Sequence, residues 1–528
     1  MQRQKRVRSW STVLVVLSLA LGTVVFAQAT APDEPRTGGT LTIAAGFEPD
    51  VLDAQKVTRA IVMEYTSLSV EGLFHIDRDG IAQPALVDTY SVSSDGLEYS
   101  FTLRGDLKFH DETPLTTDAV VASMERWFNW GSGRTVSGVL EELVVVDDLT
   151  LVVRLSEPYP LLIPSMAVPA GTGLYIFPRH LMEEAGTDNL PRLIGTGPYV
   201  QTTWTRGTSY RVDRWEDYQA RSEPTSGYAG DQTPYLDTII YRIVPDAAVR
   251  LAGMEAGEFD VAREMPSDFF DLVVANPMLR AQRYDSGPIF LQIDRAHGLT
   301  EAGWTGQQAF RQAINYAIDV REVAASIGNP EFYSADDCNL PVPPAWRTDI
   351  CQERFQAFDQ ERARAILDEI GYDGTTLTYV VDPSREMFFN PALTIAQQLR
   401  DVGINVELLT VDAATVLEMR ERPRTWDFIQ GAHSDKADPT LWSPAIPDHF
   451  GWFGSYPDDL LEVYTAVQNE TDVAARIALW ERFTDIWYDF IPMVKIADQL
   501  VMNVENVRFS GVEMPGIGIY MNYGVGWK

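Results

Sequence analysis

Cysteine, lysine and long apolar runs are all scarce in this sequence, and each scarcity limits what the protein can be. Only two cysteines are present, without a Cys-x-x-Cys pair, so neither is expected to be a catalytic thiol. Lysine is rare, arginine supplies most of the positive charge, and the formal net charge is −33. A surface this acidic repels phosphate backbones, so we do not expect nucleic acid as a partner. No segment beyond residue 26 is long and apolar enough to span a bilayer.

Signature motifs of enzymes are also missing. The sequence contains no Gly-x-Ser-x-Gly elbow, no His-Glu-x-x-His helix and no phosphate-binding loop. Its six histidines are scattered without the spacing of metal ligands, so no metal or other cofactor is predicted. The acid pair of a glycosidase need not be close in sequence, so a secreted hydrolase stays open as an alternative.

The N-terminus has the pattern of a secretory signal peptide. Residues 1–10 carry four basic residues and no acid, and residues 13–26 are nearly all apolar. Ala27 and Ala29 supply small residues at the spacing that a signal peptidase reads, so we predict a signal peptide over residues 1–29. The apolar run falls short of the about 20 residues that cross a bilayer, so no stable membrane insertion is expected after cleavage. No cysteine lies near the cleavage site, so we expect a periplasmic or otherwise extracytoplasmic protein that is not a lipoprotein.

The two cysteines are predicted to form a disulfide in that compartment. Cys338 and Cys351 flank a Pro-rich stretch of twelve residues, and an oxidising environment favours one local bond that pins this loop. Closing so short a loop contributes on the order of 3 kcal/mol at most. Two buried free thiols are the alternative.

About 500 mature residues with 45 % apolar content imply two or more lobes, and hydrophobic periodicity predicts both strands and helices. Apolar and polar residues alternate over residues 99–104, as in a half-buried strand. Beyond residue 300, apolar residues at helical spacing over 310–323 predict one long helix that ends near Gly328. Asp359 is expected to cap a second helix, which Gly371 ends.

Residues 375–432 are predicted to alternate strand, helix, strand, helix and strand, which favours a mostly parallel sheet. The last strand runs into FIQGAHSDKADPTLW at residues 428–442, where an apolar run gives way to His433, Asp435 and Asp438. Ligands of parallel sheets lie outside the carboxyl ends of the strands, so this segment is a candidate binding site. A solvated turn ahead of the proline is the alternative interpretation.

Eight segments occur in the order found in a known family. They include GGTLTIAAGFEPDVLDAQ (38–55), SSDGLEYSFTLRGDLKFHDETPLTTDAVVAS (93–123), GTGPYVQTTW (195–204), VPDAAVRLAGMEAGEFDVA (244–262), AFRQAINYAIDVREVA (309–324), RARAILDEIGYDG (362–374) and the segment ending in ADPT. With them the chain resembles the extracytoplasmic solute-binding proteins of ABC importers. Within these it is similar to the peptide/nickel-binding group, which includes dipeptide- and oligopeptide-binding proteins.

The resemblance implies an α/β fold of two lobes that close about a hinge, with an extra subdomain in the first lobe. The first lobe is then expected to comprise about residues 38–82, 195–292 and 498–528. The extra subdomain is expected at 83–194, and the second lobe at 293–497.

The resemblance also implies a set of ligand-binding residues. The predicted set is Asp435, His433, Ala432, Thr58, Arg59 and Phe47. Aligned with peptide-binding relatives, Asp435 takes the position whose carboxylate holds the ammonium group of the ligand by a charge-assisted hydrogen bond. Relatives commonly place a tryptophan and a small residue two and three positions before this aspartate, and the oligopeptide binders carry an acidic residue near positions 58 and 59. The tryptophan and the acidic residue are absent here, which counts against a long peptide as ligand.

A solute-binding protein is therefore the predicted function. It is expected to be a monomer that captures a small molecule, with a short peptide or a peptide-like amino compound favoured, and to deliver it to the permease subunits of an ABC importer. An oligosaccharide-binding member of the same family is one alternative, and opine-like compounds or metal complexes are also open. A receptor or chaperone-like role is an alternative of another class, as is the hydrolase.

Overall fold

A computed structural model describes most of the chain. It covers residues 37–57, 60–167, 173–296, 303–420, 422, 425–433, 438–446, 456–510 and 526–527. The predicted signal peptide lies outside the described residues, and so do Thr58, Arg59 and Asp435. No helix in the described part has the length and apolar character needed to cross a membrane.

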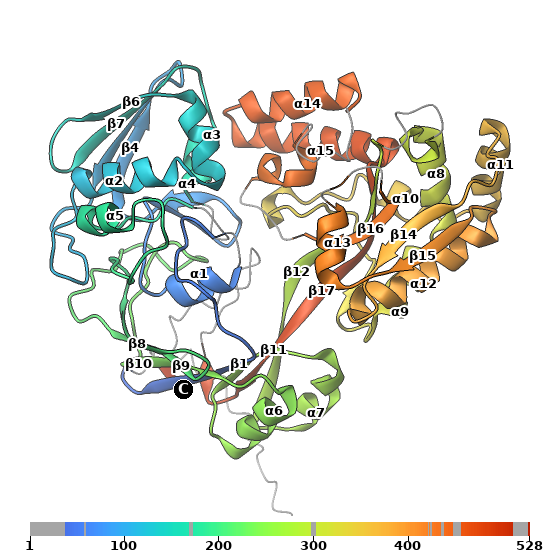
Figure 1. Ribbon diagram of the computed structural model, residues 1–528. Helices are drawn as coiled ribbons and strands as arrows, with labels where there is room; N and C mark the ends of the chain where they lie inside the picture. Colours follow the sequence, from blue (N-terminus) through green and yellow to red (C-terminus); the bar gives the residue numbers. More distant parts are fainter. Residues whose placement is uncertain are drawn as a thin grey trace, which may run out of the picture. The chain divides into compact units, whose positions relative to one another are not determined.

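One eleven-stranded sheet runs through the fold, in the order β15-β14-β16-β12-β17-β11-β1-β10-β9-β8, with β13 beside β17 (Figure 1). Its strands are β1 (Thr40–Ala45), β8 (Tyr199–Thr205), β9 (Ser209–Arg214), β10 (Thr238–Ile243), β11 (Val261–Met265), β12 (Leu279–Ile293), β13 (Tyr333–Ser334), β14 (Leu377–Val381), β15 (Val406–Thr410), β16 (Phe428–Ala432) and β17 (Met493–Asn506). β1 is parallel to β10 and β11, and β14 is parallel to β15 and β16. The two parallel groups are joined through antiparallel pairs on β12 and β17.

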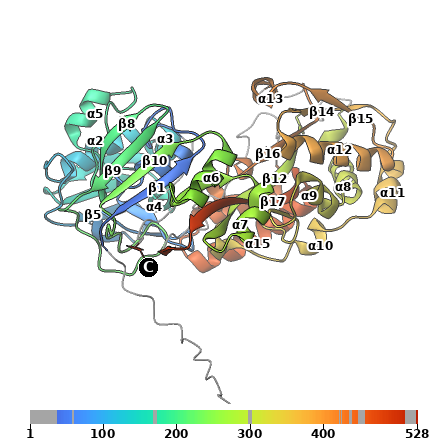
Figure 2. The ribbon, with the colours of Figure 1, turned by 90° about the horizontal axis from the view of Figure 1, so that it is seen from below.

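β12 and β17 are the longest strands, with 15 and 14 residues, and they lie side by side in both views (Figures 1 and 2). One end of the pair joins β11 and the other joins β16. We call the part built on β1 and β8–β11 the first lobe, and the part built on β14–β16 the second lobe. The register of the pair shifts between Asp285 and Gly287 and again between Ile289 and Phe290. The same stretch separates two hydrophobic cores, because Leu279 packs in a first-lobe cluster and Ile289 in the second-lobe cluster.

The first lobe carries a separate four-stranded antiparallel sheet in the order β4-β5-β7-β6. The elements of this lobe outside the large sheet are α1 (Ala60–Thr66), β2 (Phe74–Ile76), β3 (Ala82–Pro84), β4 (Val87–Val92), β5 (Glu98–Leu103), α2 (Thr117–Trp127), α3 (Gly131–Val139), β6 (Leu140–Val145), β7 (Thr150–Leu155), α4 (Leu162–Met166), α5 (Arg179–Ala185), α6 (Ala247–Ala256) and α7 (Phe270–Ala275). Every second residue of β5 is buried, as the alternation predicted. A buried ion pair of 2.5 Å between Arg126 of α2 and Asp53 fixes the helices of the small sheet to the lobe.

The second lobe contains the predicted strand-helix alternation, which the parallel pairing of β14 with β15 and β16 confirms. Its helices are α8 (Gln308–Ala317), α9 (Val320–Ile327), α10 (Gln352–Phe355), α11 (Gln360–Ile370), α12 (Glu386–Asp401), α13 (Ala413–Arg420), α14 (Asp458–Asn469) and α15 (Val473–Phe490), and a short pair, β18 (Phe509–Ser510) and β19 (Gly526–Trp527), follows β17. α11 begins after Asp359 and ends at Gly371, which has a φ of +70°, as predicted.

The predicted end of this helical stretch near Gly328 is confirmed, because α9 ends at Ile327, but the prediction of one continuous helix is wrong. The chain leaves the helical conformation at Ile318, and α9 starts anew after Asp319. The Asp319 carboxylate accepts hydrogen bonds from the backbone N–H groups of Arg321 and Glu322, at 3.0 and 3.3 Å. This N-cap makes a new helix start favourable, and the hydrophobic spacing continues across the break because both helices pack on the same core.

The predicted disulfide is present, since Cys338 and Cys351 are bonded with their Cα atoms 5.8 Å apart. The loop between them is fixed to β17 by Lys495, whose side chain is fully buried. Its ammonium group donates to the carbonyl of Asn339 in this loop at 2.8 Å, and it also lies 3.0 Å from a carboxylate oxygen of Asp337 and 2.8 Å from one of Asp498.

Candidate ligand-binding site

The carboxyl ends of β14 and β16 lie next to each other and form a crevice. β14 lies between β15 and β16 in the sheet. The chain therefore adds β15 on one side of β14 and then β16 on the other side. Such a switch in strand order opens a space outside the carboxyl ends of the strands, where ligands of open α/β sheets bind. A cavity of about 170 Å³ occupies this place and is lined by the ends of both strands and by side chains of α12 and α13.

Among the residues that line this cavity, two buried side-chain oxygens have no hydrogen-bond donor in the described part of the chain. One carboxylate oxygen of Asp382 accepts from the backbone N–H and the hydroxyl of Ser384, at 2.9 and 2.7 Å. The other oxygen of Asp382 has no partner among the described residues, and neither has the amide oxygen of Gln430. The amide nitrogen of Gln430 donates to the hydroxyl of Tyr379. A buried acceptor left without a donor costs about 1–3 kcal/mol, so this site favours a ligand that supplies N–H groups.

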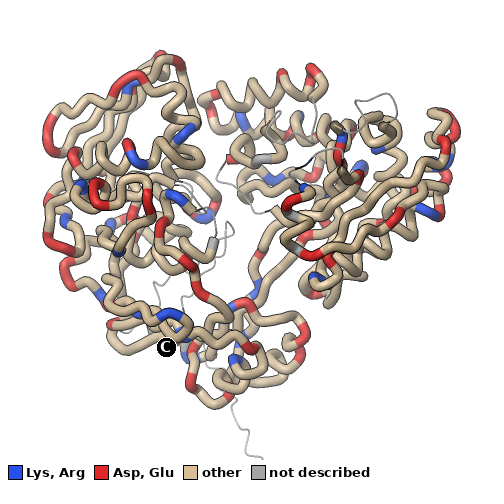
Figure 3. Tube along the Cα trace, viewed as in Figure 1, with Lys and Arg blue, Asp and Glu red and all other residues tan. Residues whose placement is uncertain are grey.

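Two arginines, Arg385 and Arg420, also line the cavity. Acidic residues, red in Figure 3, outnumber the basic residues, which are blue. Two arginines in the lining of one cavity therefore concentrate positive charge in an acidic protein. The Arg385 guanidinium lies 4.5 Å from the centre of the Phe388 ring, and within the described ranges it forms no ion pair. A guanidinium in this position is suited to a ligand carboxylate, which it can hold by two parallel hydrogen bonds.

His433 follows β16 directly, and both its backbone and its ring contact neighbouring residues. Its backbone N–H donates to the carbonyl of Pro288 at 3.0 Å, and its ring lies near the rings of Phe290 and Trp442. The amide nitrogen of Gln292 is 2.9 Å from Nε2 of the imidazole. The amide nitrogen can only donate, so Nε2 accepts and the ring proton sits on Nδ1.

Gly431 leaves the space that the end of the Gln292 side chain occupies. A Cβ atom at this position would lie 2.6 Å from the side-chain nitrogen of Gln292, which is closer than real Cβ contacts allow. The glycine therefore lets Gln292 reach across β16 to the histidine ring.

Asp438, three residues after the predicted ligand aspartate, has a structural role. Its carboxylate is buried and lies 2.7 Å from the Arg476 guanidinium of α15. It also accepts hydrogen bonds from the backbone N–H and the hydroxyl of Thr440, which start a short 3₁₀ helix at Pro439. Asp438 thus holds the chain after the strand-end segment against α15.

Phe47 lies in the first lobe, at the carboxyl end of β1, and 49 % of its side chain is exposed. It lines a small cavity together with Glu64 of α1 and Arg263 of β11. The carboxylate of Glu64 and the guanidinium of Arg263 are both buried and lie 2.6 Å apart. Burial raises the pKa of Glu64 to about 7, against the opposing effect of Arg263. The first lobe therefore also carries ionisable groups at the carboxyl ends of its parallel strands.

The structure places the predicted residues in different surroundings. Ala432 lines the cavity at the strand ends, whereas His433 contacts Gln292 beside it and Phe47 belongs to the separate cavity of the first lobe. Thr58, Arg59 and Asp435 lie outside the described residues.

Sequence reasoning missed four polar lining residues, which are Asp382, Arg385, Arg420 and Gln430. The signal for the first two was present. VVDPSRE at 380–386 repeats the pattern that singled out the segment after β16, an apolar strand followed by ionisable residues.

Two parallel groups of strands in separate lobes, joined by long antiparallel strands with a cavity at the strand ends, define a two-lobed periplasmic binding protein. The model of the family described as bacterial extracellular solute-binding proteins, family 5 Middle, matches residues 82–447, and the chain belongs to this family. It is a solute-binding protein and not an enzyme.

Relatives of this chain span nearly its whole length. It is 26 % identical over 479 residues to the probable peptide ABC transporter periplasmic-binding protein y4tO of Sinorhizobium fredii, covering 88 % of this chain and 89 % of that protein. It is 27 % identical over 404 residues to the glutathione-binding protein GsiB of Salmonella paratyphi A, covering 76 % and 73 %. Among solved structures, the periplasmic binding protein DppA of Helicobacter pylori in complex with the peptide STSA matches with a TM-score of 0.72 and 19 % identity, covering 93 % of this chain and 98 % of that one.

Proposed function

We propose that the protein captures short peptides or peptide-like amino compounds and delivers them to an ABC importer. The observation that carries the proposal is the cavity at the ends of β14 and β16, where two arginines lie with two buried acceptors that have no donor in the described part of the chain. Relatives described as a peptide ABC transporter protein and as glutathione-binding proteins support the same class of ligand.

The chemistry of the proposed site matches a ligand with both charges. Asp435, in the segment after β16, is the proposed partner of the ligand ammonium group, and Arg385 is the proposed partner of its carboxylate. The free acceptors of Asp382 and Gln430 would receive N–H groups of the ligand. The space of about 170 Å³ favours a short ligand, because sites for larger molecules run from about 300 Å³ upward.

We also propose that the mature protein starts after residue 29, is free in the periplasm and acts as a monomer. The basic and apolar N-terminal pattern supports export. Ligand contacts in both lobes would favour a closed state, and the register shifts of β12 and β17 between the lobes offer positions for the hinge.

Native mass spectrometry of freshly purified protein tests the proposed ligand class, because enclosed ligands often survive purification. We expect an adduct whose released mass corresponds to a di- or tripeptide or a close derivative. Calorimetry with a panel of dipeptides, glutathione, an opine and an oligosaccharide then ranks the classes. Tight binding of the oligosaccharide alone would contradict the proposal, and hydrolysis of any panel member during incubation would point to an enzyme instead.

A further inference from the structure

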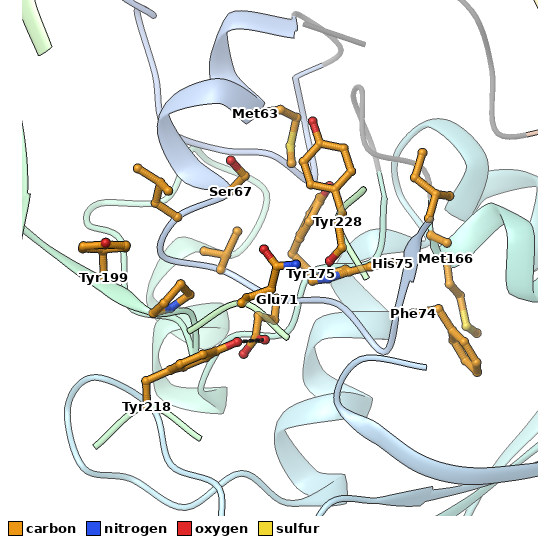
Figure 4. Close-up of a pocket in the computed structure, with 16 residues that line it drawn as sticks. Met63, Ser67, Glu71, Phe74, His75, Met166, Tyr175, Tyr199, Tyr218 and Tyr228 are labelled. Carbon is orange, nitrogen blue, oxygen red and sulfur yellow. Dashed lines mark hydrogen bonds between the residues drawn. The ribbon is translucent and has the colours of Figure 1, made fainter. Parts of the chain in front are cut away.

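A second cavity, of about 60 Å³, lies inside the first lobe and shares no lining residue with the cavity at the ends of β14 and β16. It is bordered by α1, by β2, by the end of α4, by the start of β8 and by the loop that follows β9 (Figure 4). None of the six predicted ligand-binding residues lines it. The proposed capture site therefore leaves this cavity without a role.

Aromatic side chains form much of the wall of this cavity. The contributing rings are those of Phe74, His75, Tyr175, Tyr199, Tyr218 and Tyr228. Met63 and Met166 add polarizable side chains between them. In Figure 4, Tyr218 and Tyr199 lie on one side of the space, and Met63 and Tyr228 on another. Rings that surround a small space attract a cation through their negative faces.

Glu71 places one carboxyl group in this aromatic enclosure. It accepts a hydrogen bond of 3.1 Å from the hydroxyl of Tyr218, which Figure 4 marks. Within the described part of the chain, no cationic group lies at ion-pair distance from it. The nearby guanidinium groups of Arg104 and Arg221 are directed at backbone carbonyls, and Arg221 also pairs with Glu223. Burial outweighs these distant charges and raises the pKa of Glu71 to about 7.

The other ionisable group of the cavity cannot neutralise this carboxylate. His75 accepts a hydrogen bond on Nε2 from the backbone N–H of Gly72, at 3.0 Å, so its proton sits on Nδ1, 3.1 Å from the carbonyl of Tyr228. Burial lowers the pKa of His75 to about 4, which keeps the ring neutral. The hydroxyl of Tyr199, which is 1 % exposed, has the backbone of Leu236 as a polar neighbour. Glu71 is therefore the one carboxylate among the residues that line this cavity, where aromatic and aliphatic side chains are joined by the polar groups of Ser67 and Gln232.

We propose that this cavity is a second binding site, which takes a small primary ammonium ion between the Glu71 carboxylate and the surrounding rings. The ammonium group would donate a charge-assisted hydrogen bond to the carboxylate. Its alkyl part would lie against the tyrosine rings and the methionines, where cation–π attraction adds to the charge pair.

The proposed site has a defined pH dependence. Only the ionised form of Glu71 attracts a cation, and the carboxyl group is increasingly protonated below pH 7. An alkylammonium ion keeps its charge across this range. Affinity should therefore rise between pH 6 and pH 8, whereas His75, neutral throughout, contributes no change.

Methylammonium chloride is the probe, and saturation-transfer NMR on the mature protein at pH 8 is the measurement. A ligand with so few atoms binds no more tightly than about millimolar, a range that this method covers. We expect saturable transfer to the methyl group, weakened at least tenfold in Glu71→Gln and also at pH 6. Glu258→Gln, the same change at an exposed glutamate of the first lobe, should bind like the wild type.

A second variant keeps the carboxylate and fills the space. Ser67→Leu places a larger side chain in the cavity wall and should abolish transfer even if Glu71→Gln folds poorly. Equal binding by wild type, Glu71→Gln and Ser67→Leu would overturn the proposal. The absence of transfer to the wild type would also overturn it, and would mean that the cavity holds a carboxyl group with no cation beside it. Loss of transfer in Asp435→Asn but not in Glu71→Gln would assign the probe to the strand-end site instead. The experiment therefore tests this second site independently of the proposed ligand-capture function.

Discussion

Two aspartates three residues apart, Asp435 and Asp438, have opposite expected roles. Asp438 is buried against Arg476, at 2.7 Å, so Asp438→Asn leaves a buried guanidinium without its charge partner. Breaking a buried pair in this way costs about 3–5 kcal/mol. We expect the free energy of unfolding, measured with denaturant, to fall by that order, while Asp435→Asn serves as the matched control and changes it far less. Equal stabilities of the two variants would contradict the structural role of Asp438.

At the scale of residues, the sequence could indicate one segment beside the candidate cavity but not the polar residues that line it. The segment after β16 stands out because ionisable residues interrupt an apolar run. Gln292 and Gln430 could not be found in this way, because a glutamine inside a strand looks like any other polar position. They matter only through pairing, since Gln292 reaches His433 across β16 and Gln430 meets Tyr379 of β14.

At the scale of elements, the disulfide-closed loop stabilises the second lobe at β17. The loop covers Lys495, and the Tyr488 hydroxyl donates to the carbonyl of Cys338 at 2.8 Å. Closing this loop should contribute on the order of 3 kcal/mol. We therefore expect Cys338→Ser with Cys351→Ser to lower the denaturant midpoint of unfolding, and a reductant to lower the wild type to the same value. An unchanged midpoint in the double variant would contradict this account.

Periodicity predicted elements well where one helix or strand packs on one core, as for β5 and the strand-helix alternation of the second lobe. It failed at α8 and α9, because a hydrophobic face can continue across a break. Only the capping aspartate, Asp319, distinguishes two helices from one there. The pairing of β12 with β17 was also beyond local patterns, since it joins residues more than two hundred positions apart.

At the scale of the whole molecule, buried carboxyl groups set how stability depends on pH. Burial raises the pKa of Glu64 and of Glu71 to about 7, and that of Asp498 to about 6. The folded state binds these protons more tightly than the unfolded state. Their contribution is therefore complete below the ordinary pKa values, 4.5 for the two glutamates and 3.8 for Asp498, and is lost as the pH rises through 6 and 7.

Glu71→Gln tests this pH dependence, because the amide cannot ionise. Relative to the wild type, the variant should gain up to about 3 kcal/mol in unfolding free energy between pH 5 and pH 8. Denaturant unfolding at the two pH values measures the difference, and Glu258→Gln, at an exposed position, is the control. A difference between variant and wild type that is the same at both pH values would contradict the assignment.

The central claim is that the segment after β16 faces a ligand and that Asp435 holds its ammonium group. Calorimetry of wild type, Asp435→Asn and Asp438→Asn, with the peptide or amino compound found by native mass spectrometry, tests it most directly. The substitution at 435 keeps the shape of the side chain and removes the charge, so affinity should fall by about 2–5 kcal/mol, or some thirtyfold or more. The substitution at 438 should lower stability and leave affinity much less changed. Equal affinity of wild type and Asp435→Asn would contradict the claim and make the segment a solvated turn.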